Sequence, residues 1–159
     1  CLFLLDSGVR GSELCALNVS DVNMQTGAVM VRQGKGQKDR TAFVGANVRR
    51  DLSKYLASRN ATGNAPLFVS QKRAGKRITL SGLVQLMERL RKFTKIAELT
   101  AHTWRRTFIT RCLLTGMNLH TLAQIAGHSD IQMMRRYLRL VETDLQEAHR
   151  QSGVVDNLF

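Results

Sequence analysis

The sequence predicts a mainly α-helical domain with a small antiparallel β-sheet, an α+β fold class. Apolar residues recur every three to four positions over most of the 159 residues, as they do on the buried face of a helix. Two short apolar runs break this pattern, and the glycine-containing basic loop between them is typical of a β-hairpin. With 43% hydrophobic residues, one proline and no linker-like stretch, the chain is expected to fold as one domain.

The N-terminal third contains two helical pieces and the hairpin. Residues 1–6 predict the end of a buried helix that stops at Gly8, and residues 12–17 predict a second helix. The expected strands are residues 28–31 and 41–44, joined by the basic loop of residues 34–40.

Helices dominate the rest of the chain. An apolar stripe that includes Leu52 and Leu56 predicts a helix over residues 47–58, and Thr79 is suited to cap a helix over residues 79–97. Between these two helices, residues 67–69 are a candidate third strand. The further expected helices cover residues 102–114, residues 118–126 with Gly127 at their end, residues 131–140 and residues 144–150.

The charge of the chain favours a polyanionic partner. Its 24 Lys and Arg residues against 12 Asp and Glu residues give a net charge of +12. A compact domain this basic typically meets nucleic acid, although a basic soluble protein or a protein bound to an anionic membrane surface has the same charge. No run approaches the roughly 20 apolar residues of a membrane span, and no signal peptide is evident. We therefore expect a nucleic-acid partner and no membrane.

The cysteines and the first residues bear on location and completeness. Cys1, Cys15 and Cys112 are odd in number, widely spaced and outside any metal-ligand pattern. Buried, reduced thiols in a cytoplasmic protein account for them. The chain begins within an apolar helical pattern and without Met, so we expect a fragment that lacks a natural N-terminal part.

Two segments present arginines in positions suited to phosphate chemistry. Arg10 lies between a helix stop and a helix start, so its planar fork of donors is aimed from a rigid corner. His102 and Arg105 are three residues apart and can reach one ligand from the same face of a helix. Each segment alone also fits an ordinary surface arginine or a capping histidine.

A third segment supplies a histidine and a tyrosine. His128 follows Gly127 at a helix end, and Tyr137 comes nine residues later. Tyr55, the only other tyrosine, lies between leucines on an apolar stripe and is expected in the core, which makes Tyr137 the candidate nucleophile. The alternative is a Tyr137 packed on the core with its hydroxyl at the surface. The positively charged residues around Tyr137, which favour its phenolate and an approach to DNA, are Arg135, Arg136 and Arg139.

Together these segments resemble the catalytic boxes of the tyrosine recombinases, also called phage integrases, over nearly the whole chain. The matches in chain order are Arg10 with Glu13, His102 with Arg105, and Gly127-His128 with Tyr137. The hairpin loop Gly34-Lys35-Gly36 is similar to the β-turn that carries the catalytic lysine of that family. Lys38, in the same loop, is the alternative lysine, and a plain DNA-backbone contact is the alternative role for the loop.

Three departures from the family pattern stand close to these boxes. Arg106 replaces a common His, Ala126 replaces a frequent Leu, and Met133-Met134 replace small hydroxyl residues. None of them removes a catalytic position, so we interpret them as tuning.

The resemblance implies a tyrosine recombinase catalytic-domain fold and covalent DNA strand transfer without metal or ATP. Tyr137 would attack a DNA phosphate to give a 3′-phosphotyrosyl link and a free 5′-hydroxyl. Arg10 and Arg105 would bind the non-bridging oxygens, and Glu13 would orient Arg10. The remaining catalytic candidates are His102 and His128 as hydrogen-bond donors and Lys35 as the acid for the leaving oxygen.

The resemblance also implies the partners and the domain plan. Residues 1–159 would form the catalytic domain, with the N-terminal DNA-binding domain absent, and act on double-stranded DNA as a homo-oligomer, as in a tetrameric synapse. The C-terminal tail would either dock on a neighbouring protomer or fray. The location would be the cytoplasm of a bacterium that carries the gene itself or on a phage or mobile element. The expected DNA-backbone contacts are Lys38, Arg40, Lys72, Arg73, Arg106 and Arg136.

Two other functions use the same residues. A type IB topoisomerase-like enzyme would reseal the same strand, although the order and spacing of the boxes fit integrases better. A catalytically inactive DNA-binding regulator of the same fold would be expected to lose at least one catalytic position. The sequence names neither the recombination site nor the element that carries the gene.

Overall fold

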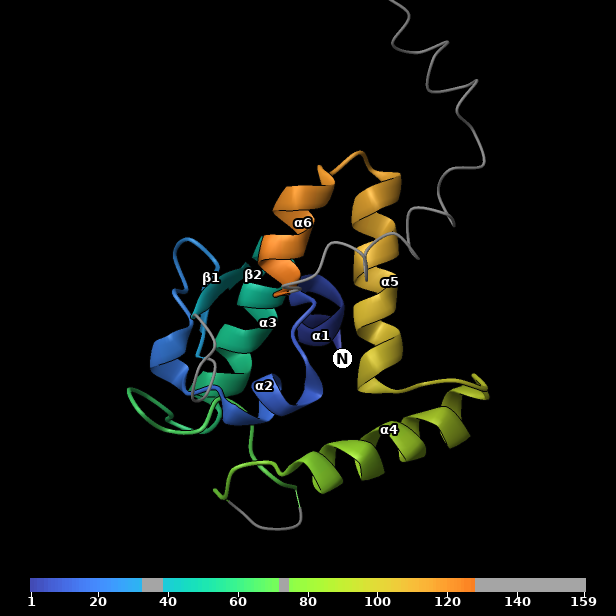
Figure 1. The fold of residues 1–159 in the computed structure, drawn as a ribbon. Coiled ribbons are helices and arrows are strands. Elements are labelled where there is room, and N and C mark those ends of the chain that lie inside the picture. The colour runs from blue at the N-terminus through green and yellow to red at the C-terminus, as the bar shows by residue number, and fades with distance from the viewer. Residues whose placement is uncertain (33–38, 72–74, 128–159) are drawn as a thin grey trace, which may run out of the picture.

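The computed structural model describes residues 1–32, 39–71 and 75–127, and these form the helical domain with one hairpin shown in Figure 1. The mainly α fold class with a small antiparallel sheet is therefore confirmed. In chain order the elements are α1 (Leu2–Ser7), α2 (Gly11–Ala16), the 3-10 turn η1 (Val19–Asp21), β1 (Ala28–Val31), β2 (Arg40–Phe43), α3 (Ala46–Ala57), α4 (Leu80–Thr94), α5 (Ala101–Leu114) and α6 (Leu119–Ala126).

The hairpin pairs β1 with β2 in antiparallel register, with Val31 opposite Arg40. Alternate residues point inward, so Val29, Val31 and Ala42 are buried while their neighbours lie nearer to solvent. The predicted strands are confirmed to within one residue. Because the pairing begins at Arg40, this residue stands at the base of the loop that contains the predicted lysines.

The prediction of a third strand at residues 67–69 is wrong. Within the described residues the sheet has two strands, and Val69 makes only a single bridge with Arg77. The backbone N–H of Leu67 instead donates to the carbonyl of Leu17 at 2.9 Å, at the end of α2. Pro66 has no N–H to continue a ladder, so the segment lies against α2 rather than beside the hairpin.

Two hydrophobic clusters hold the helices in place. The larger one lies between α1, α2, the hairpin and α3, and α4 closes it with Leu83 and Met87. The smaller one joins α5 and α6 through Ile109, Leu113 and Leu122. Since α6 also packs against β2, its C-terminal end lies over the hairpin and close to the end of α1 (Figure 1).

Glycine and threonine set three of the helix boundaries. Gly8 ends α1 in the left-handed conformation, and a Cβ there would overlap the ring of Phe108, so glycine lets α1 approach α5 closely. The predicted cap of α4 is confirmed, because the Thr79 hydroxyl accepts from the backbone N–H of Gly82 at 3.1 Å. Thr100 caps α5 in the same way, which starts this helix one residue before the predicted His102.

The cysteines agree only in part with the prediction of buried thiols. All three are free, but Cys15 is buried, Cys112 is half-buried and Cys1 is exposed. Burial raises the pKa of the Cys15 thiol, and the charge of Arg77 partly opposes this effect.

Two further predictions concern the C-terminal helices and a membrane span. The helices predicted over residues 131–140 and 144–150 lie outside the described residues. None of the helices in residues 1–32, 39–71 and 75–127 has both the length and the apolar character needed to span a bilayer.

Candidate functional site

The C-terminal end of α6 has an unusual set of hydrogen-bond donors. Gly127 ends this helix in the left-handed conformation, and its N–H donates to the carbonyls of Ala123 and Gln124. The next three carbonyls, those of Ile125, Ala126 and Gly127, accept from side chains instead. A helix leaves its last carbonyls without intrahelical partners, so each must be satisfied from elsewhere.

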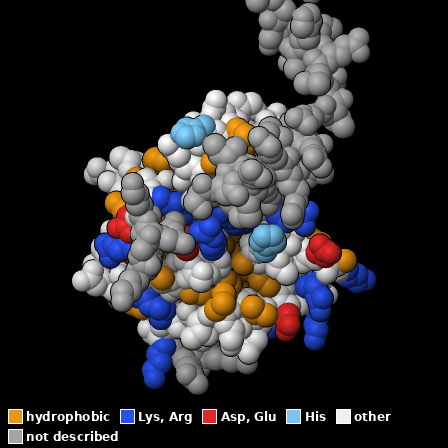
Figure 2. All heavy atoms as spheres, in the orientation of Figure 1, with side chains coloured by type: hydrophobic (Ala, Val, Ile, Leu, Met, Phe, Trp, Pro, Cys, Tyr) orange, Lys and Arg blue, Asp and Glu red, His pale blue; other side chains and the backbone are white. Residues whose placement is uncertain are grey.

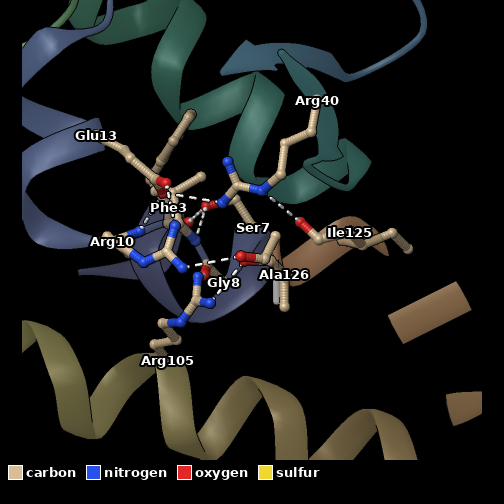
Figure 3. A network of polar contacts seen from close by, with 11 residues as sticks. Phe3, Ser7, Gly8, Arg10, Glu13, Arg40, Arg105, Ile125 and Ala126 are labelled. Carbon is tan, nitrogen blue, oxygen red and sulfur yellow. Dashed lines mark hydrogen bonds and ion pairs between the residues drawn. The ribbon is translucent and has the colours of Figure 1, made fainter. Parts of the chain in front are cut away.

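All three donors are arginines, and they come from distant parts of the sequence (Figure 3). Arg40 donates from Nε to the Ile125 carbonyl at 3.1 Å, and Arg105 donates from Nη2 to the Ala126 carbonyl at 2.6 Å. Arg10 donates from Nη2 to the Gly127 carbonyl at 2.8 Å. Because the three carbonyls are consecutive, the guanidiniums gather at one point, where the partial negative charge of the helix end stabilises them.

Arg10 is held at the corner between α1 and α2. Its backbone N–H donates to Oε2 of Glu13 at 2.6 Å, and its Nη1 donates to Oε1 of the same carboxylate at 2.9 Å. The expected contact between Glu13 and Arg10 is thus present. The side chain of Arg10 keeps 39% of its surface exposed. The corner therefore presents a guanidinium with a fixed direction and an open side.

Arg105 joins the ends of two helices. It lies on α5 with only 4% of its surface exposed, and its Nη1 donates to the carbonyl of Gly8 at 2.6 Å. A second bond goes to Ala126, as described above. Arg105 therefore holds the end of α1, just before Arg10, against the end of α6.

Arg40 occupies a different place from the one expected for a DNA-backbone contact. Its side chain is 8% exposed and forms an ion pair with Glu13, between Nη2 and Oε2 at 2.8 Å. Two of the three nitrogens of its guanidinium, Nε and Nη2, are thus used inside the protein. The sequence carries a signal for the inward position of Arg40. Ala42 and Val44 are buried, and side chains two residues apart on a strand point to the same face, so residue 40 points inward as well.

Glu13 stands between Arg10 and Arg40. Burial by itself raises the pKa of this carboxyl, but the hydrogen bond from the Arg10 backbone, the charge of Arg40 and the two guanidinium hydrogen bonds outweigh it. The net effect is a pKa below the ordinary value of 4.5. Within the described residues, the three arginines at the end of α6 thus meet one ionised carboxylate, which leaves an excess of positive charge suited to an anion.

His102 and Arg106 lie at the start of α5, on the rim of a groove. The groove runs between α4 and the N-terminal end of α5, has a volume of about 440 Å³, and includes both residues in its lining. Both side chains are exposed. Arg106 thus lies where a contact with a polyanion is open to it, whereas Arg105, its neighbour in the sequence, faces the interior.

One face of the molecule displays much of this charge. Figure 2 shows Lys and Arg side chains around a central patch of hydrophobic side chains, in the region between α2, α4 and α5. Among the described residues, no group of three or more His, Cys, Asp and Glu side chains is arranged to hold a metal ion.

Of the two tyrosines, Tyr55 lies within the described residues. The hydroxyl of Tyr55 accepts from Arg59 at 2.8 Å and from the backbone N–H of Val69 at 3.3 Å, so it has a structural role. Tyr55 also packs against the larger hydrophobic cluster, as expected. The predicted site residues that lie outside the described residues are Lys35, Lys38, Lys72, Arg73, His128, Arg136 and Tyr137. The last described residue, Gly127, comes directly before His128.

Comparisons with known proteins identify the family of the chain. Residues 1–143 match the phage integrase family. The chain is 32% identical to the tyrosine recombinase XerC of Thermodesulfovibrio yellowstonii over 92% of its own length and 50% of that protein. It therefore spans about half the length of the curated relatives it matches.

Two solved structures share the fold. The crystal structure of XerA recombinase superposes with a TM-score of 0.80 at 35% identity, covering 94% of this chain and 55% of that one. The Tn1549 transposon integrase in complex with circular intermediate DNA superposes with a TM-score of 0.72 at 26% identity, covering 86% of this chain and 53% of that one. From the match over residues 1–143 and these likenesses, we conclude that the chain belongs to the phage integrase family, whose tyrosine recombinase motifs its sequence carries.

Proposed function

We propose that the chain is the catalytic domain of a site-specific DNA recombinase or integrase, which cleaves and rejoins strands through a covalent 3′-phosphotyrosyl intermediate. The observation that carries the proposal is the meeting of Arg10 and Arg105 at the carbonyls of Ala126 and Gly127. These two arginines are 95 residues apart in the sequence, from position 10 to position 105. In the proposal the open side of Arg10 faces the phosphate, and Arg105, held beside it at the same helix end, adds its positive charge.

The chemistry is an in-line displacement at phosphorus. The Tyr137 oxygen attacks the phosphate, the bond to the 5′-oxygen breaks, and Lys35 protonates that leaving oxygen. Arg10 and Arg105 neutralise the non-bridging oxygens, and His102 and His128 donate further hydrogen bonds. A 5′-hydroxyl from another strand then attacks the phosphotyrosine, which releases Tyr137 and reseals the DNA in a new connection.

Double-stranded DNA is the proposed substrate. The net charge of +12 and the exposed Arg106 at the rim of the α4–α5 groove support it. A relative of the same fold, the Tn1549 integrase, has been solved with DNA. In the proposal Lys38, Lys72, Arg73 and Arg136 add phosphate contacts, and several copies of the protein act together on DNA, as a tetramer in the synapse.

A covalent-adduct assay tests the proposal. The purified protein is incubated with DNA that carries a nick next to the cleavage site, and a denaturant-resistant protein–DNA adduct is expected. Tyr137→Phe should abolish the adduct because it removes the attacking oxygen. Tyr55→Phe is the matched control, since it removes the only other tyrosine hydroxyl and should leave adduct formation intact.

The same assay separates the alternatives. Salt-dependent DNA binding by the protein without any adduct would identify a non-catalytic regulator and contradict the proposal. An adduct accompanied by relaxed plasmid, with no exchange between two sites, would identify a topoisomerase-like activity. An adduct that Tyr137→Phe retains would show that another residue is the nucleophile.

A further inference from the structure

Arg40 links three parts of the candidate site through one buried side chain. It is the first residue of β2, its Nη2 pairs with Glu13 at 2.8 Å, and its Nε donates to the Ile125 carbonyl at 3.1 Å. The hairpin, the corner that holds Arg10 and the end of α6 therefore share a single guanidinium (Figure 3).

Arg40 influences the position of the Arg10 side chain through Glu13, which is bonded to both. Glu13 uses Oε1 for the Arg10 guanidinium, while its Oε2 receives both the Arg10 backbone N–H and Arg40. Arg40 thus fixes the rotation of the carboxylate that in turn fixes Arg10. Without Arg40, a carboxylate with only 10% of its surface exposed would lose one of its two cations and one of its orienting hydrogen bonds.

The contact with α6 is equally close. A Cβ on Gly127 would lie 2.5 Å from Nε of Arg40 and 2.7 Å from its Cδ, so the arginine side chain packs directly against this glycine. Because Arg40 is tied at both ends, it cannot move aside at little cost. The backbone that leads into His128 therefore rests on Arg40.

A contribution to stability does not by itself explain why a buried arginine occupies position 40. Nη1 of Arg40 is buried without a hydrogen-bond partner among the described residues. A buried ion pair often contributes no more to stability than apolar side chains of similar volume, and an unpaired polar nitrogen adds a cost. Geometric control of the neighbouring groups is the role that its two directed bonds can fill.

We propose that Arg40 is a positioning residue for DNA strand cleavage: it sets the direction of Arg10 through Glu13 and ties the base of the Lys35 hairpin to the end of α6, without contacting DNA. This inference rests on the proposed recombinase function. It replaces the interpretation of Arg40 as a DNA-backbone contact.

The test combines adduct kinetics with a double-mutant cycle. Arg40→Gln is expected to slow adduct formation about 100-fold, the size of effect that a misplacement of about 1 Å causes. In a Glu13→Gln background the same change should cost less than about tenfold, because the coupled partner is already lost. The salt dependence of DNA binding should stay as in the wild type, since no phosphate contact is removed.

A matched control separates positioning from general stability. Arg59 is half-buried and donates to two backbone carbonyls, those of Pro66 and Leu67, which are not part of the arginine cluster at α6. Arg59→Gln should lower the melting temperature and leave the adduct rate of the folded protein within about threefold of wild type. Its effect should add to that of Glu13→Gln rather than couple with it.

A conservative variant covers the case in which Arg40→Gln does not fold. Lysine keeps the charge but can reach only one of the two partners, so Arg40→Lys should fold and cleave about tenfold more slowly. Wild-type cleavage by folded Arg40→Lys would overturn the inference, and so would an additive cycle with Arg40→Gln. If the wild type itself forms no adduct, the proposed function fails, which is a separate outcome.

Discussion

Arginine side chains donate to the last carbonyls of helices α2 and α6, but one arginine does so at α2 and three do so at α6. At the end of α2, a single arginine, Arg77, donates to the carbonyls of Cys15, Ala16 and Leu17, at 3.1, 2.8 and 2.8 Å. The Leu17 carbonyl also accepts from the backbone N–H of Leu67. At the end of α6, three arginines from three distant segments each take one carbonyl. One arginine is therefore enough to cap a helix, and the extra charge at α6 needs another explanation.

The proposed phosphate ligand would supply that explanation. Glu13 compensates one of the three charges at α6, and Arg10 keeps an exposed side that faces outward. At α2 the second arm of Arg77 is used inside the protein, since its Nη2 donates to Asn18 at 2.5 Å. The end of α2 is thus closed, whereas the end of α6 keeps an open guanidinium, that of Arg10, for the proposed phosphate.

Removing Arg105 should cause the largest effect. Arg105→Gln leaves the carbonyls of Gly8 and Ala126 without their charged donor and takes one positive charge from the proposed phosphate site. We expect a loss of about 3 kcal/mol in unfolding free energy and an adduct rate about 1000-fold lower. Arg111→Gln, at an exposed position on the same helix, is the control for the urea titrations and the adduct assay. If Arg105→Gln and Arg111→Gln had the same unfolding free energy and the same adduct rate, the role proposed for Arg105 would be refuted.

A pair of glycine substitutions measures the packing at the end of α6. Gly127 and Gly116 both have positive φ, 68° and 83°, but a Cβ on Gly116 would meet nothing within 4 Å. Both alanine variants should lose about 1 kcal/mol from backbone strain. Gly127→Ala should lose at least about 1 kcal/mol more and slow cleavage roughly tenfold, since Arg40 must shift. If the two alanine variants had the same urea midpoints and adduct rates, the close packing of Gly127 on Arg40 would contribute nothing to stability or cleavage.

The isolated cap at α2 should affect stability alone. Arg77→Gln removes the donor to three carbonyls, and we expect unfolding free energy to fall by about 1–2 kcal/mol. The adduct rate of the folded protein should remain within about threefold of wild type. A strong loss of cleavage by a variant that is still folded would mean that the end of α2 also belongs to the site.

The pH dependence should reveal the charge on Glu13. Its pKa is lowered in the folded protein, so its contribution to stability is complete above the ordinary value of 4.5 and is lost as pH falls through the lowered native value. Glu13→Gln should therefore flatten the fall in unfolding free energy from about pH 6 down to about pH 3. Glu98→Gln, at an exposed carboxylate outside the network, is the control, and an acid limb left unchanged by Glu13→Gln would contradict the assignment.

The sequence predicts much of the fold because the signals are local. Gly8, Thr79 and Gly127 end or begin helices where they were expected to, and the hairpin lies within one residue of its predicted place. The third strand failed because the hydrogen bonds of residues 66–69 go to partners such as Leu17, which local pattern cannot identify.

The site is predicted less completely, for a related reason. Arg10, Glu13 and Arg105 are recognised from short boxes, but their partners are backbone carbonyls that carry no sequence signal. Arg40 follows a basic glycine-containing loop, which suggests a surface position, and its partners Glu13 and Ile125 are 27 and 85 residues away. Only the strand alternation through Ala42 indicates that its side chain points inward.

The separation of Arg10 from its acceptor has a consequence for synthesis of the protein. The carbonyl of Gly127 lies 117 residues downstream of Arg10, and that of Ala126 completes the placement of Arg105. A nascent chain that has emerged only as far as α5 holds both arginines without the backbone that aligns them. The two guanidiniums are therefore brought together only after α6 has been made, so a copy that stops at α5 would carry both arginines without the helix end that gathers them.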